Sequence, residues 1–369
     1  MPETATVLIV DDSRIFRAAI EAAVSGQDAL AVAGSVFSGQ KALEFIRSRP
    51  PDIVTLDVEM PGMDGLQTLQ QIQQFNRTRP AGSEIGVLMV SAFTKRGADV
   101  TMQALQTGAF DFVTKPNGTS ATENLELLRQ DLLPKIRMFL ARRRRIASAS
   151  STAQVVPTPA ATPPTPNQPI GLPRSVRAVL IGASTGGPKA LATILPDLTA
   201  RVDLPIVVVQ HMPAEFTRSF ADNLSRQSRC AVVEAEHGQL VQARTVYIAR
   251  GGKHLVLCHD PQGRLVTRLN DEPLESGCRP SASVLFRSAA ATLGREAVAV
   301  VLTGMGNDGT AGLGPLKRAG GFVIAQDEAS SVVWGMPGSA VAAGLVDAVL
   351  PLGEIAAATA ALTIRRSPK

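Results

Sequence analysis

The stretch "VLIGASTGGPKAL", residues 179–191, decides the fold of the second half of the chain. An apolar run ends at a turn of small residues, and a run of helical character follows. Residues 182–186 of the turn fit the pattern G-x-S-x-G, in which a serine nucleophile occupies a sharp turn from strand to helix. A glycine-rich phosphate cradle and a plain tight turn are the two other interpretations of this stretch.

The phosphate interpretation fits the spacing poorly. A dinucleotide fingerprint requires G-x-G-x-x-G, whereas Ala183, Ser184 and Thr185 follow the first glycine. A P-loop requires G-K-[ST], and here Lys189 follows a proline. Anion binding at the start of the helix stays open as a minority alternative.

Short apolar runs alternate with amphipathic runs on both sides of this stretch, which is typical of parallel α/β sheets. We therefore expect an α/β protein with two doubly wound domains. Short alternating runs around residues 231–269, separated by Gly-Gly and Pro-Gln-Gly turns, predict an antiparallel addition to the second sheet. The expected strands are 6–10, 30–35, 53–56, 87–90 and 109–113 in the first domain, and 178–181, 206–209 and 298–302 in the second.

A proline-rich segment, "SASSTAQVVPTPAATPPTPNQP" at residues 148–169, separates the two halves. Such a composition cannot make a packed core and predicts a semi-extended tether. A length of 369 residues also favours two domains over one. We expect a first domain at residues 1–140, a linker at 141–174 and a second domain at 175–369.

Composition excludes several classes of protein. Aromatic residues make up 4% of the chain, which is too few for base-stacking platforms. Much of the net charge of +5 lies in the run Arg142–Arg145, which we interpret as a solvated helix end. Cys230, Cys258 and Cys278 are odd in number and lack C-x-x-C spacing, so a disulfide framework or a zinc site is not expected.

The location follows from the same features. An odd set of cysteines suits a reducing compartment. The N-terminus lacks the basic and apolar regions of a signal peptide, and no apolar run approaches the roughly 18 residues of a membrane span. We expect a cytoplasmic, monomeric protein that neither inserts into membranes nor binds nucleic acid.

Five polar residues follow expected strands of the first domain. Asp11 and Asp12 come after the first strand, Asp57 ends the third, Ser91 follows the fourth and Lys115 follows the fifth. Functional groups of open α/β sheets gather at the carboxyl ends of strands. Clustered carboxylates repel one another unless a hard cation lies among them, and Mg²⁺ prefers such oxygen ligands. The pattern predicts a Mg²⁺ site.

Ser184 requires a base, and the chain has four histidines. His211 follows the apolar run 206–209, so it shares the predicted sheet edge with Ser184. His237, His254 and His259 lie in polar or turn segments, where a structural role is the default. His211 is therefore the expected base.

Two aspartates are candidates to orient this base. Asp308 and Asp327 each follow an expected strand, and Asp308 is favoured because its glycine-rich surroundings allow the backbone to approach a reacting centre. Asp327 stays open, and a helix N-cap is the structural alternative for Asp308. The order Ser184, His211, Asp308 differs from that of α/β-hydrolases, so the G-x-S-x-G match does not imply that fold.

The first domain resembles the receiver domain of two-component response regulators. The resemblance lies in "LIVDDSRIFR", "DIVTLDVEMPGMDG", "VLMVSAFT" and "GAFDFVTKP", and it implies a flavodoxin-like fold over about residues 5–125. It also implies that Asp57 accepts a phosphoryl group and that Asp11, Asp12 and Asp57 hold Mg²⁺. Three further residues would respond to phosphorylation: Ser91, Phe110 and Lys115.

The second domain resembles the catalytic domain of chemotaxis protein-glutamate methylesterases. The matching motifs are "GASTGGPKAL", "VVVQHMP", "FTRSFADNL", "IARGGKHL", "VLTGMGNDGTAGL" and "AQDEASSVVWGMPGSA". The resemblance implies a Rossmann-like sheet, a catalytic triad of Ser184, His211 and Asp308, and Thr185 and Met305 as residues lining its oxyanion site. The run "RPSASV", residues 279–284, differs from the commoner Pro-Ser-Val-Asp sequence at this place.

The resemblance further implies a phosphorylation-activated hydrolase of glutamate methyl esters on chemoreceptors, with deamidation of receptor glutamines by the same route. Its phosphodonor would be a chemotaxis-type histidine kinase, and receptor clusters at the membrane would recruit it. Ester hydrolysis would need no metal. Gly186 and Gly187 are expected to keep the turn open for the substrate. A receiver joined to a partner-binding domain and a DNA-binding regulator are the alternatives.

Overall fold

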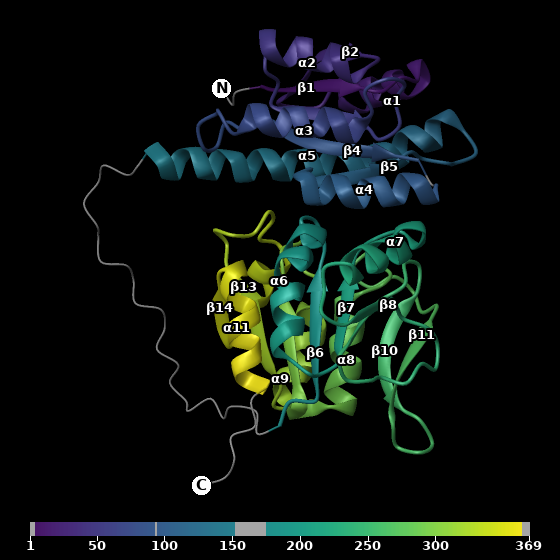
Figure 1. Ribbon diagram of the computed structural model, residues 1–369, viewed down its shortest axis with the longest axis vertical. Helices are drawn as coiled ribbons and strands as arrows, with labels where there is room; N and C mark the ends of the chain where they lie inside the picture. The colour runs from purple at the N-terminus through teal and green to yellow at the C-terminus, as the bar shows by residue number, and fades with distance from the viewer. Residues whose placement is uncertain (1–3, 93, 152–174, 364–369) are drawn as a thin grey trace. The chain divides into compact units, whose positions relative to one another are not determined.

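A large parallel sheet organises each half of the chain (Figure 1). The computed structural model describes residues 4–92, 94–151 and 175–363, which divide into two compact units on either side of the proline-rich segment. Most of that segment, from residue 152 on, lies outside the described residues. Among the described residues, no helix combines the length and apolar character that crossing a bilayer requires.

The first unit is a five-stranded parallel sheet in the order β2-β1-β3-β4-β5. Its strands are β1 (Ala5–Val10), β2 (Leu30–Val36), β3 (Ile53–Asp57), β4 (Gly86–Ser91) and β5 (Asp111–Thr114). Its helices are α1 (Arg14–Val24), α2 (Gly39–Ser48), α3 (Gly65–Asn76), α4 (Lys95–Thr107) and α5 (Ala121–Ser151). Strands β3 and β4 are buried along their whole length, because helices cover both faces of the sheet. This is why their sequences are largely apolar rather than alternating.

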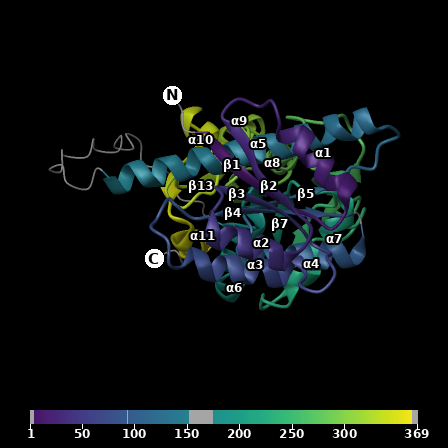
Figure 2. The same cartoon turned by 90° about the horizontal axis from the view of Figure 1, so that it is seen from above.

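Helices α1 and α5 cover one face of this sheet, and α2, α3 and α4 cover the other (Figure 2). The first face buries a cluster that includes Ile9, Val113, Leu132 and Ile136. Chain order reverses between β1 and β3, which lie side by side at the centre. In open α/β sheets, sites form at the carboxyl ends of strands beside such a switch point. The predicted flavodoxin-like receiver fold is confirmed.

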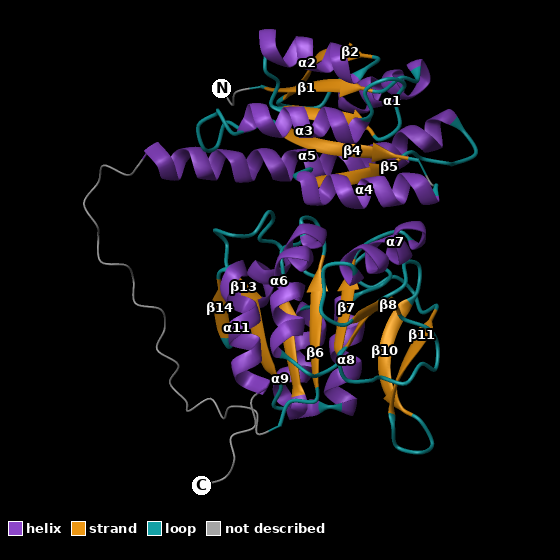
Figure 3. Ribbon diagram, viewed as in Figure 1, coloured by secondary structure: helices purple, strands orange, loops and turns teal. Residues whose placement is uncertain are grey.

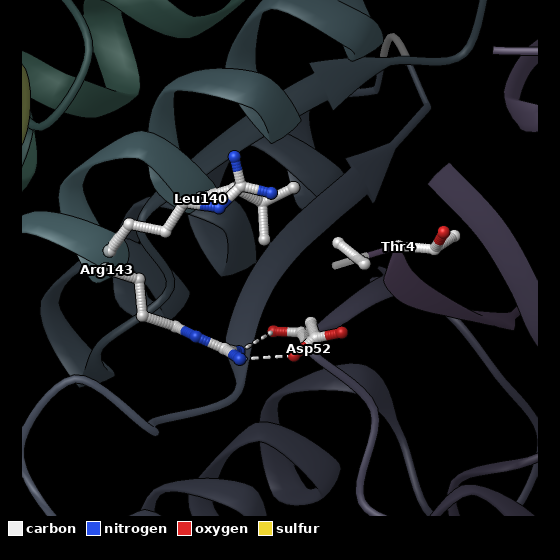
Figure 4. Close-up of a pocket in the computed structure, with 6 residues that line it drawn as sticks. Thr4, Asp52, Leu140 and Arg143 are labelled. Atoms are coloured by element: carbon white, nitrogen blue, oxygen red, sulfur yellow. Dashed lines mark hydrogen bonds and ion pairs between the residues drawn. The ribbon is translucent and has the colours of Figure 1, made fainter. Parts of the chain in front are cut away.

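Helix α5 continues past residue 140, where the first domain was expected to end, and runs to Ser151. The guanidinium of Arg143 forms an ion pair with Asp52 (Figure 4). Thr6 donates to the same carboxylate through its amide and its hydroxyl. Asp52 and Arg143 also line a small cavity of about 90 Å³. Burial also lowers the pKa of Arg142. Arg142 and Arg143 are therefore partly packed on the sheet, whereas Arg144 and Arg145 are exposed, so the interpretation as a solvated helix end fits only the second half of the run.

The second unit is a seven-stranded sheet in the order β14-β13-β12-β6-β7-β9-β8, and every strand pair in it is parallel. Its strands are β6 (Ala178–Ala183), β7 (Ile206–Gln210), β8 (Ala231–Glu234), β9 (Thr245–Ile248), β12 (Ala297–Val301), β13 (Phe322–Gln326) and β14 (Ala348–Leu350). The expected antiparallel addition is a separate two-stranded sheet of β10 (His254–His259) and β11 (Leu265–Asn270) (Figure 3).

Helices cover both faces of the second sheet. They are α6 (Gly187–Arg201), α7 (Ala214–Ser225), α8 (Ala282–Thr292), α9 (Thr310–Arg318), α10 (Met336–Ala342) and α11 (Leu352–Thr363). Helix α6 packs against α7 and α11, whereas α8 packs against α9 and against β10. The switch point lies between β6 and β12, so the carboxyl ends of these two strands are where a site is expected.

Candidate catalytic and phosphorylation sites

The turn after β6 presents Ser184. The Ser184 amide donates to the carbonyl of Thr303 at 3.1 Å, and the Gly187 amide donates back to the Ser184 carbonyl at 2.7 Å. The buried side chain of Gln210 donates to that same carbonyl at 2.9 Å. Gly186 has a φ of +76° and caps α6, which turns the chain sharply from strand into helix. The nucleophile turn is therefore fixed by three strands rather than by its own sequence alone.

The two glycines of this turn serve internal packing. A Cβ on Gly186 would lie 2.6 Å from the side chain of Val332, and one on Gly187 would lie 2.0 Å from Oε1 of Gln210. Substitution at either position would displace a neighbour inside the domain. The expectation that Gly186 and Gly187 also keep the turn open for the substrate stays a prediction.

His211 lies beside Ser184 because β6 and β7 pair in parallel, with Ala183 opposite Gln210. The His211 amide donates to the Ala183 carbonyl at 3.1 Å. Its Nε2 lies 2.7 Å from Oδ2 of Asp308, and its Nδ1 lies 3.4 Å from Sγ of Cys278. The hydroxyl of Ser184 makes no hydrogen bond to another described residue. The structure thus forms the pair of His211 and Asp308, with Ser184 on the adjoining strand end.

The carboxylate of Asp308 is almost completely buried and accepts from several donors. Besides His211, these are the Ser281 hydroxyl and the amides of Ala282, Ser283 and Gly309, at 2.6–3.1 Å. Two of these amides belong to the first turn of α8, whose positive dipole end favours an anion. Asp308 is therefore held as a carboxylate facing His211.

Burial favours the uncharged form of Asp308, but hydrogen bonds from His211, Ser281 and Ala282 outweigh it and hold its pKa well below its usual range. Burial likewise opposes protonation of His211. Hydrogen bonds to Asp308 and Cys278, with their charges, outweigh that effect and raise the pKa of His211 to about 9. An ionised Asp308 requires the ring proton on Nε2, so neutral His211 carries its lone pair on Nδ1.

The structure brings Asp308, and not Asp327, to His211. Asp327 instead accepts from the amide and hydroxyl of Ser330, three residues along the chain. Two of the other histidines have structural surroundings: His237 contacts the backbone of Leu269, and His254 is buried with Nε2 3.0 Å from the Pro273 carbonyl. These placements agree with the order of preference drawn from the sequence.

Backbone amides near Ser184 are candidates to bind an oxyanion. Thr185 is buried in the turn, while the side chain of Met305 is 42% exposed at the carboxyl end of β12. The amides of Thr185 and Met305 donate to no other described residue. A Cβ on Gly304 would lie 2.8 Å from Cβ of Ser184, which shows how closely the two strand ends approach. An anion at this edge would meet unpaired donors.

The first unit gathers its carboxylates as the sequence predicts. One oxygen from each of Asp11, Asp12 and Asp57 lies within 4.8 Å of the others. Lys115 Nζ lies 2.9 Å from Oδ2 of both Asp11 and Asp57. An all-oxygen donor set of three clustered carboxylates fits Mg²⁺.

Electrostatics at this site also favour a cation. Burial and the neighbouring charge of Asp11 raise the pKa of Asp57 to about 6, although Lys115 opposes the shift. Burial acts against protonation of Lys115, yet the two aspartates raise its pKa. A divalent cation among the carboxylates would relieve the repulsion that makes Asp57 basic.

Ser91 and Phe110 have different surroundings. Ser91 ends β4 opposite Thr114 and is fully buried, and its hydroxyl donates to the Ala92 carbonyl at 3.3 Å. Phe110 stacks on Phe139 of α5 with ring centroids 4.7 Å apart. Phe110 thus packs with the helix, and its role as a phosphorylation switch stays a prediction.

Four residues at the second site were not identified from the sequence: Gln210, Cys278, Ser281 and Ser283. Gln210 supports the Ser184 turn, and Ser283 donates to Asp308 through its amide while its hydroxyl accepts from Gly309. The departure at residues 279–284 was the available signal for Ser281 and Ser283. Nothing in the sequence indicated that Cys278 would reach His211.

Known proteins resemble both units. Residues 179–359 match the model of the CheB methylesterase family, and residues 7–125 match that of the response regulator receiver domain. A protein-glutamate methylesterase/protein-glutamine glutaminase of Nocardioides sp. is 43% identical over 353 residues, which cover 95% of this chain and 93% of the relative. One from Nitrobacter hamburgensis is 39% identical over 360 residues, covering 96% and 93%.

A solved structure, the CheB methylesterase catalytic domain of Thermotoga maritima, is 42% identical with a TM-score of 0.49. It covers 51% of this chain and 99% of that chain.

Proposed function

Because this chain belongs to the protein-glutamate methylesterase/protein-glutamine glutaminase family, with a receiver domain ahead of the catalytic domain, we propose that Ser184, His211 and Asp308 perform its hydrolysis. The enzyme removes methyl esters from glutamate side chains of chemoreceptors and deamidates glutamines. The observation that carries the residue assignment is the buried Asp308 carboxylate, 2.7 Å from His211 at the sheet edge that presents Ser184.

Each proton then has a route under this proposal. Asp308 accepts the Nε2 proton of His211, so Nδ1 takes the hydroxyl proton as Ser184 attacks the ester carbonyl. A glutamyl-enzyme ester forms and methanol leaves with a proton returned by His211. Water, deprotonated by the same nitrogen, then attacks the acyl group and releases the free carboxylate. For a glutamine the leaving group is ammonia.

The tetrahedral intermediate carries a negative charge on the former carbonyl oxygen. The amides of Thr185 and Met305 stand at the edge of the turn and bind this oxyanion. A preorganised donor of this kind contributes about 3 kcal/mol to transition-state stabilisation. Ester hydrolysis on this route uses protein groups alone.

The receiver unit controls the reaction. Asp57 accepts a phosphoryl group from a chemotaxis-type histidine kinase. Asp11, Asp12 and Asp57 would hold Mg²⁺, which would supply positive charge beside the phosphoryl oxygens. Ser91 and Lys115 then contact the phosphoryl oxygens, and Phe110 responds to that rearrangement. Phosphorylation shifts the protein toward a form in which the receptor reaches Ser184.

The cellular setting follows from this substrate. The enzyme acts as a cytoplasmic monomer that joins membrane receptor clusters through its receptors. It neither inserts into the bilayer nor binds nucleic acid. The proline-rich tether, residues 152–174 of which lie outside the described residues, connects the controlling unit to the hydrolase.

Methanol release from a methylated receptor tests the assignment. We expect Ser184→Ala to reduce the rate by at least about 10³-fold, because the nucleophile is lost. Ser228→Ala, in the loop after α7, is the matched control and should retain the wild-type rate. Labelling of Ser184 by a serine-directed phosphonate separates an esterase from a partner-binding domain. Unchanged methanol release in Ser184→Ala would contradict the assignment.

A further inference from the structure

His211 has a neighbour on the nitrogen that the proposed mechanism uses as the base. Cys278 Sγ lies 3.4 Å from Nδ1, while Asp308 occupies Nε2 on the other side of the ring. We propose that Cys278 is a positioning residue of the esterase, whose thiol holds the His211 ring against Asp308 before Ser184 engages it. This inference rests on the proposed function, because it takes His211 to be the base.

A built turn carries this cysteine. Glu275 and Cys278 form an antiparallel bridge, with backbone hydrogen bonds of 3.2 and 2.9 Å in the two directions. Ser276 and Gly277 between them have φ values of +53° and +74°. A two-residue turn with positive φ at both positions is a tight and well-defined geometry. The position of the thiol is thus set by the backbone of the turn.

Two arginines fasten the turn to the rest of the domain. Arg287 of α8 binds both carboxylate oxygens of Glu275, at 3.0 and 2.5 Å. Arg279 donates to the carbonyls of Asp271 and Glu272, at 3.1 and 3.0 Å. Bidentate pairing fixes orientation as well as distance. The thiol is therefore positioned by this turn and its arginines, and not by the strands that carry Ser184 and His211.

A thiol suits this position because its sulfur is a weak acceptor for the Nδ1 proton of charged His211, and its S–H is a weak donor to Nδ1 of the neutral ring. Sγ of Cys278 also lies 3.6 Å from the Ser276 carbonyl, so a single proton has two possible acceptors. The contact with Nδ1 is strong enough to orient a ring that Asp308 already holds. It is weak enough to give way when the Ser184 hydroxyl engages the same nitrogen.

The charged groups around His211 give the proposal a pH signature. Asp308 faces the ring from the loop after β12, Cys278 faces it from the turn, and Arg287 acts on Asp308 from α8. The hydrogen bond that charged His211 makes to Sγ of Cys278 is among the causes that raise the pKa of His211. Removing the thiol therefore lowers that pKa. Because the neutral ring is the base, the acid limb of the activity profile moves to lower pH.

The test compares Cys278→Ala and Cys278→Ser with the matched control Cys258→Ser, on β10. Full-length protein with excess phosphodonor is assayed for methanol release from methylated receptor, between about pH 6 and about pH 10. For Cys278→Ala we expect kcat to fall about tenfold with KM within about twofold, and the acid limb to shift downward. Cys278→Ser should recover part of kcat, and Cys258→Ser should match the wild type.

A second measurement avoids any effect of the substitutions on folding. Methyl methanethiosulfonate added to folded protein joins a methylthio group to Cys278, as the thiolate displaces methanesulfinate. We expect activity to fall in wild type and in Cys258→Ser, to return with dithiothreitol, and to be unaffected in Cys278→Ala. Unchanged kcat and an unmoved acid limb in Cys278→Ala would overturn the positioning role.

The outcome for Ser184 separates the two proposals. If Ser184→Ala and His211→Ala abolish activity while Cys278→Ala matches the wild type, only the role of Cys278 fails. If Ser184→Ala stays active and Cys278→Ala is inactive, the thiol is the nucleophile, which overturns both the positioning role and the Ser184 assignment.

Discussion

Asp308 is a carboxylate buried at a strand end, where an unpaired charge would be costly. Its hydrogen bonds from the start of α8 and from Ser281 stabilise the ionised form, and His211 completes the set. The donors that keep Asp308 charged also prevent it from serving as a donor. This residue therefore fixes the tautomer of His211 as well as its orientation.

Asp308→Asn tests that double role. The amide keeps the side-chain shape but directs either its NH₂ group or its weaker acceptor at His211, so the required tautomer is lost. We expect kcat for methanol release to fall by about 10³- to 10⁴-fold. The pKa of His211 should fall from about 9 toward its ordinary value, so the acid limb of the residual activity moves to lower pH.

Asp327→Asn is the matched control, because Asp327 also follows a strand of the same sheet but binds Ser330. Its kcat should stay within about twofold of wild type. A larger loss in Asp327→Asn than in Asp308→Asn would reverse the choice of acid.

The turn between β6 and α6 shows why an element boundary is so restricted. Gly186 adopts a left-handed conformation and leaves no room for a Cβ beside Val332. Most other positions along β6 and α6 would tolerate a wider choice of residues. At this boundary the chain must reverse while the Ser184 backbone stays bonded to β12 and β7.

Comparing Gly186→Ala with Gly238→Ala separates the cost of backbone strain from the cost of overpacking. Both glycines have a φ of +76°, but a Cβ on Gly238 meets nothing within 4 Å. We expect Gly238→Ala to destabilise by about 1 kcal/mol from backbone strain alone. Gly186→Ala should lose a further 1–3 kcal/mol, roughly, from overpacking, together with esterase activity. Equal free energies of unfolding in denaturant titrations of the two variants would contradict this reason for Gly186.

Strands and strand-end residues could be predicted because their signals are local. A buried parallel strand is a continuous apolar run, and the polar residue after it falls at the sheet edge, as Asp57 and His211 do. The end of α5 could not be predicted, because Arg143 is held by Asp52, 91 residues earlier in the chain. Composition alone made residues 141–151 resemble the start of the tether.

At the scale of the whole molecule, too, contacts between distant parts of the sequence could not be predicted. In each unit the chain reverses its order at the centre of the sheet, and the predicted acids or nucleophile gather there. Cys278 lies in a turn and Ser281 at the start of a helix, and neither position belongs to this strand-end pattern. Their contacts with Asp308 and His211 depend on how α8 packs, which no sequence periodicity encodes.

Coupling between the two units is a property of the full chain, and Asp57 is the residue that tests it. We expect a small-molecule phosphodonor with Mg²⁺ to raise methanol release by wild-type protein at least about tenfold, since a minor active population of a few per cent leaves that range for activation. Asp57→Ala should keep the basal rate and lose the increase, because the acceptor carboxylate is absent. Asp99→Asn, on the exposed side of α4, is the matched control and should respond like wild type. Equal wild-type rates with and without phosphodonor would show that the receiver does not control Ser184, whereas activation of Asp57→Ala would place the acceptor elsewhere.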